Sequence, residues 1–121
     1  MLERVSAQDN ELNSYQTAMA EQAMAAAAKA ESEIVAGQYR GPLHGIPVAV
    51  KDLCFINGVP TRGGLAVLRD FLPEYDATVV QRLESAGAIL LGKLNLTEGE
   101  PPWRAGTWRD NRSCWASYPE R

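Results

Sequence analysis

The sequence is poor in cysteine and histidine and has no long apolar run. Its 121 residues include two Cys and one His. These are too few for a disulfide framework, and Cys54, Cys114 and His44 lack the spacing of metal ligands, so we expect no metal site. No stretch approaches the ~20 apolar residues of a membrane span, and residues 1–4 do not resemble the start of a secretion signal. We therefore expect a cytoplasmic protein that does not enter a membrane.

An excess of basic residues is also missing. The chain carries 12 Lys plus Arg against 15 Asp plus Glu, for a net charge of −3. Proteins that bind nucleic acid usually present a basic face, so we expect no nucleic-acid partner. With 45% apolar and 22% charged residues, the composition is typical of a soluble globular protein. The length allows at most one domain.

The first third of the chain is rich in alanine. Eight of the thirteen residues from 18 to 30 are Ala, the strongest helix former. This composition predicts a helix from Ala18 to about Ala36, which Thr17 caps and Gly37 ends. A shorter helix is expected at Leu2–Ala7. Between the two helices stand four residues that are typical of loops: Asp9, Asn10, Asn13 and Ser14.

The middle of the chain alternates between strand and helix patterns. Ile46–Val50 and Ala88–Leu91 are short apolar runs of the kind that forms buried strands. Between them we expect a short helix at Leu65–Phe71 and another at Ala77–Ser85, which Asp76 caps. The apolar face of the second helix comprises Val79, Val80 and Leu83. This order predicts a βαβ unit whose two strands pair in parallel, with the second helix packed across them.

Lys51 and Asp52 directly follow the first predicted strand. Open α/β folds place functional groups at the carboxyl ends of parallel strands, which makes both residues candidates for a site. The alternative is that they merely solvate the end of the strand.

Two other motifs have simpler interpretations. Gly87 to Lys93 matches the glycine and lysine spacing of a phosphate-binding loop, but Leu94 replaces the required Ser or Thr. Because the residues that would form this phosphate-binding loop are predicted to form a strand, we interpret the match as accidental. Cys54 and His44 flank one strand and resemble a nucleophile with its base, but a lone Cys after a buried strand is usually a small apolar filler.

Three segments together resemble a known family. They are GPLHGIPVAVKD (residues 41–52), GVPTRGG (58–64) and DATVVQRLESAGAILLGKLNLTEG (76–99). They are similar to the N-terminal part of the amidase signature hydrolases, which cleave amide bonds with a Ser/cis-Ser/Lys triad. The resemblance implies an α/β fold, here truncated, with a mixed, mainly parallel sheet flanked by helices. It also implies a small-molecule amide substrate for the full-length parent and no cofactor.

Lys51 is the one triad member that the resemblance places in this chain. A lysine can activate a serine hydroxyl if burial lowers its pKa, and the apolar run before Lys51 suggests such surroundings. We therefore expect its ammonium to face a cleft. In the family, both serines lie in glycine-rich segments downstream, so we expect the chain to be inactive alone.

The composition changes abruptly near the C-terminus. All three Trp lie after residue 100, and Ser113 and Ser117 are not flanked by glycine. We therefore divide the chain into an amidase segment (1–99) and a divergent tail (100–121), whose composition a frameshift would explain. Alternatives are an interaction module whose tail binds a partner and a fragment like the A subunit of an amidotransferase, although residues 95–99 resemble free-standing amidases more closely. Truncation would leave exposed sheet edges through which copies could self-associate.

Overall fold

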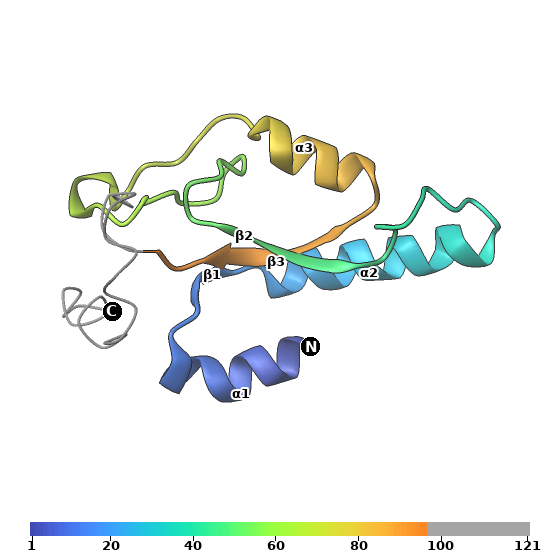
Figure 1. The fold of residues 1–121 in the computed structure, drawn as a ribbon, viewed down its shortest axis with the longest axis horizontal. Helices are drawn as coiled ribbons and strands as arrows, with labels where there is room; N and C mark the ends of the chain where they lie inside the picture. Colours follow the sequence, from blue (N-terminus) through green and yellow to red (C-terminus); the bar gives the residue numbers. More distant parts are fainter. Residues whose placement is uncertain (97–121) are drawn as a thin grey trace.

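A computed structural model describes residues 1–96 of the chain, which form a mixed α/β fold (Figure 1). The fold class predicted from the sequence is therefore confirmed. In chain order the elements are α1 (Leu2–Leu12), β1 (Tyr15–Ala18), α2 (Ala20–Val35), β2 (Pro47–Lys51), the 3₁₀ turn η1 (Ala66–Leu68), α3 (Thr78–Ser85) and β3 (Ile89–Leu94). No helix among these residues is long and apolar enough to cross a membrane.

The three strands form one mixed sheet in the order β1-β3-β2. β2 runs parallel to β3, with Pro47 opposite Ile89 and Lys51 opposite Leu94, which confirms the predicted pairing. β1 pairs with the other side of β3 in the antiparallel direction. β3 continues three residues beyond the predicted end at Leu91, because Gly92 and Lys93 also pair with both neighbouring strands.

Helices cover both faces of the sheet, with α2 on one side and α3 on the other (Figure 1). Side chains of β3 alternate between the two layers, as the pleat requires. Leu90 joins the α3-side cluster with Met19, Val50, Ile56, Val59 and Val80, and Ile89 and Leu91 join the α2-side cluster with Ala23 and Ala30. Burial on both faces explains why β3 begins as a continuous apolar run. The predicted packing of α3 across the strands is confirmed.

The N-terminal region differs from the prediction in two ways. α1 continues to Leu12, so Asp9 and Asn10 are helical; the Asp9 carboxylate accepts the backbone N–H groups of Ser14 (2.7 Å) and Tyr15 (3.1 Å). Thr17 does not cap α2, because it lies within β1, a strand that the prediction missed. β1 has only four residues and carries no apolar run, so the pattern gave no signal for it.

The region around α3 requires smaller corrections. Asp76 does not cap the helix, because its carboxylate accepts the N–H of Asn57 at 2.7 Å; Ala77 occupies the cap position. Val80 is fully buried, whereas Val79 is 47% exposed and lies outside the packed face. The helix predicted at Leu65–Phe71 is a single 3₁₀ turn, whose hydrogen bonds span three residues instead of four.

Gly92 is the point of closest approach between β1 and β3. Its φ is +148°, and a Cβ there would collide with the carbonyl oxygen of Thr17 and lie 3.0 Å from the Cα of Ala18. We expect Gly92→Ala to lower the free energy of unfolding by about 2–3 kcal/mol, since backbone must move to admit the methyl group. Urea denaturation of the 121-residue chain measures the change.

Gly37→Ala is the matched control for Gly92→Ala. Gly37 also has a positive φ (+77°), but nothing lies within 4 Å of its missing Cβ. Only the cost of the backbone conformation remains there, about 1 kcal/mol. Equal losses of stability in the two variants would show that the contact between β1 and Gly92 is not the cause.

Candidate active-site segment

Lys51 is the last residue of β2, at the carboxyl edge of the parallel pair. The preceding Val50 is buried in the α3-side cluster, so strand alternation turns Lys51 to the opposite face, where it is exposed. Lys51 lines neither of the two surface clefts described below. Because Lys51 is exposed in residues 1–96, the expectation that its ammonium faces a cleft stays a prediction for the assembled enzyme.

Asp52, the next residue, does not simply solvate the end of the strand. It is 1% exposed, and its Oδ1 lies 2.7 Å from the Nζ of Lys93 on β3. Lys93 itself is fully buried. The sheet thus carries a completely desolvated ion pair directly beside Lys51.

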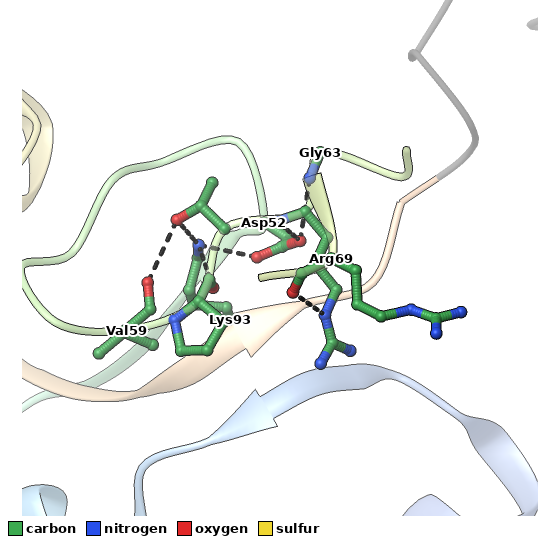
Figure 2. A network of polar contacts seen from close by, with 8 residues as sticks. Asp52, Val59, Gly63, Arg69 and Lys93 are labelled. Carbon is green, nitrogen blue, oxygen red and sulfur yellow. Dashed lines mark hydrogen bonds and ion pairs between the residues drawn. The ribbon is translucent and has the colours of Figure 1, made fainter. Parts of the chain in front are cut away.

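Three oxygen atoms surround the Lys93 ammonium (Figure 2). Besides Asp52, it donates to the carbonyl of Pro60 at 3.0 Å and to the hydroxyl of Thr61. Burial lowers the pKa of Lys93, and the Asp52 carboxylate opposes this shift by favouring the ammonium. The ion pair and the two hydrogen bonds together hold the Lys93 side chain in one orientation.

The second carboxylate oxygen of Asp52 holds the loop that follows β2. Its Oδ2 accepts the backbone N–H groups of Arg62 (2.9 Å) and Gly63 (3.1 Å). The Asp52 carbonyl also accepts the Gly63 N–H at 3.3 Å. We call Asp52, Thr61 and Lys93 the buried cluster. It ties β2, β3 and the loop at residues 60–63 together.

Lys93 was not predicted as a functional residue. In the sequence, Lys93 was noted only as part of the motif that resembles a phosphate-binding loop. Gly92 and Lys93 lie within β3, so this segment is a strand and the motif match is accidental. One signal was available: Lys93 lies two residues after an apolar run that is buried on both faces. A lysine there must find an anion, and Asp52 is the acidic residue at the end of the paired strand.

His44 and Cys54 do not form a thiol site. They lie beyond opposite ends of β2, and Cys54 packs against the α3-side cluster, in agreement with its interpretation as a filler. His44 is 5% exposed; its Nδ1 accepts the N–H of Arg40 at 3.2 Å, and its Nε2 lies 3.1 Å from the Glu33 carboxylate. Within residues 1–96, no cluster of three or more His, Cys, Asp or Glu side chains could hold a metal.

Two shallow clefts flank α2. The first, of about 440 Å³, is polar on one side, where Glu33, Arg40, His44 and Glu84 line it. The second, of about 490 Å³, is mainly apolar and includes Ile34 and Val35 of α2. In the first cleft, a 2.6 Å ion pair joins Glu33 to Arg40. These contacts fasten the loop before β2 to the end of α2.

The contacts of Glu33 predict that the stability of the chain depends on pH in the acid range. A hydrogen bond from Arg40 lowers the pKa of Glu33 below its ordinary value of 4.5. Its contribution is therefore complete above 4.5 and is lost as the pH falls through the lowered folded-state pKa. The urea concentration at the midpoint of unfolding is measured between about pH 3 and 6. We expect this midpoint to fall less steeply with decreasing pH in Glu33→Gln than in the parent. Glu31→Gln, an exposed change on the same helix, should keep the slope. An unaltered slope in Glu33→Gln would remove Glu33 from this account.

Comparison with known proteins identifies the class of this fold. Residues 1–100 match the Amidase family. The chain is 51% identical over 98 residues to "Putative amidase AmiD" of Mycobacterium tuberculosis, covering 81% of this chain and 21% of that protein. It is 48% identical over 97 residues to the A subunit of the glutamyl-tRNA(Gln) amidotransferase of Anaeromyxobacter dehalogenans, covering 80% and 20%.

A solved structure agrees with these sequence matches. The native peptide amidase from Stenotrophomonas maltophilia superposes with a TM-score of 0.74 at 39% identity, over 80% of this chain and 20% of that one. The chain belongs to the Amidase family and spans about a fifth of the length of these relatives. The resemblance drawn from the three sequence segments is confirmed. The segment boundary at residues 99 and 100, together with the tail, lies outside the described residues.

Proposed function

We propose that this chain supplies the catalytic lysine of an amide-hydrolysing site, with Lys51 as the base of a Ser/cis-Ser/Lys triad. One observation carries the proposal: Lys51 ends a strand that pairs in parallel with β3, in a segment that matches the Amidase family. The carboxyl edge of parallel strands is where open α/β folds gather functional side chains. Lys51 is exposed here, so other parts of an amidase fold must enclose it.

The proposed reaction converts a carboxylic amide and water into an acid and ammonia or an amine. A neutral Lys51 amine accepts a proton through the bridging serine, and the nucleophilic serine oxygen bonds to the amide carbon. The C–N bond then breaks, and the proton leaves with the nitrogen. Water hydrolyses the resulting ester in the same way and regenerates the serine. Neither serine is assigned to this chain, so we propose that it does not turn over amides alone.

The substrate of the whole enzyme is proposed as a small-molecule amide, handled in the cytoplasm without a nucleic-acid partner. The 48% identity to the A subunit of an amidotransferase supports a second candidate, in which the amide nitrogen passes to another acceptor. We favour a free-standing amidase, because residues 95–99 resemble that group and the identity to AmiD is slightly higher. β2 is an edge strand of the sheet formed by residues 1–96, and we further propose that copies of the chain self-associate through this edge.

A graft tests the proposed function. Residues 1–99 replace the corresponding segment of the Stenotrophomonas peptide amidase, and ammonia release from a peptide amide is measured. We expect the graft to hydrolyse the peptide amide, because the two segments share a fold and their sequences are 39% identical. The peptide amidase with that segment deleted is the control. A folded graft with no more activity than this control would contradict the proposal.

A further inference from the structure

The backbone on both sides of Lys51 is fixed by hydrogen bonds. The N–H of Asp52 donates to the carbonyl of Leu94 at 2.9 Å, and the carbonyl of Lys51 accepts the N–H of Cys54 at 3.0 Å. The direction in which the Lys51 side chain leaves the strand therefore depends on where this turn is held. The Asp52 side chain, on the opposite face, is the part of the turn that reaches into the interior.

The buried cluster joins that turn to two other segments. Asp52 binds the Lys93 ammonium of β3 through one oxygen and the N–H groups of Arg62 and Gly63 through the other. Lys93 in turn binds Pro60 and Thr61. If the carboxylate moved, the ends of both strands and the loop at residues 60–63 would lose their common anchor.

From these contacts we infer that Asp52, Lys93 and Thr61 are positioning residues, which hold Lys51 and the loop at residues 60–63 in one fixed arrangement for catalysis. The inference rests on the proposed function, because it concerns the base that the proposal assigns. None of the three residues is proposed to touch substrate; the buried cluster acts through the placement of Lys51.

Stability alone does not explain a fully buried ion pair. Removing two charges from water costs several kcal/mol, and apolar residues of similar size are often equally stable in their place. An apolar pair, however, offers no acceptor to Arg62 and Gly63 and no donor to Pro60. What the charged pair adds is a defined geometry at the end of the strand, where displacement by about 1 Å can cost roughly a hundredfold in rate.

The double variant Asp52→Leu/Lys93→Met in the graft separates these roles. It removes both charges and keeps an apolar filling. We expect kcat to fall by about tenfold or more while KM changes by less than about threefold, because placement of the base is lost without loss of substrate contacts. Parental kcat in a folded double variant would overturn the inference.

If the double variant does not fold, a milder variant tests the positioning role instead. Thr61→Val keeps both charges and the side-chain shape but removes one acceptor from Lys93. We expect kcat to fall by about threefold or more and Thr61→Ser to restore it. A parental kcat for Thr61→Val would then overturn the inference.

Lys51→Ala in the same graft distinguishes failure of the inference from failure of the proposed function. If Lys51→Ala keeps full activity, the proposed base is wrong, and the positioning role falls with it. If Lys51→Ala is inactive while the cluster variants keep parental kcat, only the positioning role is wrong.

Discussion

We expect Lys51→Ala to lower kcat of the grafted amidase by about a thousandfold or more. Loss of one member of a nucleophile and base unit typically removes most of the rate enhancement, because the remaining members cannot move the proton. KM should change much less, since Lys51 is proposed to act on a serine and not on the substrate. Initial rates of ammonia release over a range of peptide amide concentrations give both constants.

Two matched variants serve as controls for Lys51→Ala. Lys51→Arg keeps the charge but provides a guanidinium that stays protonated, so we expect it to be nearly as inactive as the alanine variant. Lys29→Ala changes an exposed lysine on α2 and should leave kcat unchanged. Undiminished hydrolysis by Lys51→Ala would remove Lys51 from catalysis.

We expect Lys93→Met to destabilise the 121-residue chain by about 3–5 kcal/mol, since it leaves the Asp52 carboxylate buried without its counter-charge. Both side chains are essentially inaccessible to water, so solvent cannot replace the lost partner. The free energy of unfolding from urea denaturation at neutral pH measures the effect. A loss this large is comparable with the whole stability of a small domain, so a stabilising osmolyte is needed in every sample.

Two controls show whether the lost charge causes this destabilisation. Asp52→Leu/Lys93→Met removes both charges, and we expect it to recover part of the loss, since the N–H groups of Arg62 and Gly63 then lack their Asp52 acceptor. Lys29→Met makes the same change on the exposed face of α2 and should stay within about 0.5 kcal/mol of the parent. If Lys93→Met is as mild as Lys29→Met, the buried ion pair does not contribute as described.

The βαβ unit was predictable because its signals are local. The valines of β2 and the apolar start of β3 mark buried strands, and the apolar spacing in α3 marks the helix between them. β1 was not predictable in this way. Its four residues form a strand because Gly92 lets the β1 backbone approach β3, and this partner lies more than seventy residues away in the sequence.

The residues of the candidate site also differ in how far local sequence signals identify them. Lys51 was identified through the family resemblance, and its place at the end of a parallel strand followed from the pattern around it. Lys93 and Thr61 were missed, because their roles depend on contacts with Asp52 across the fold. A strand pattern alone cannot show whether Lys51 faces a cleft, because burial depends on every segment packed around a residue and the pattern describes only one of them.

Ammonia release from amides by the purified 121-residue chain, measured beside the graft, tests the central claim most directly. The claim is that this chain supplies the base of an amidase site but not the nucleophile. It predicts many turnovers by the graft and none by the chain alone. Multiple turnovers by the chain alone, abolished by a substitution at Cys54 or Ser113, would contradict it and place a nucleophile within these 121 residues.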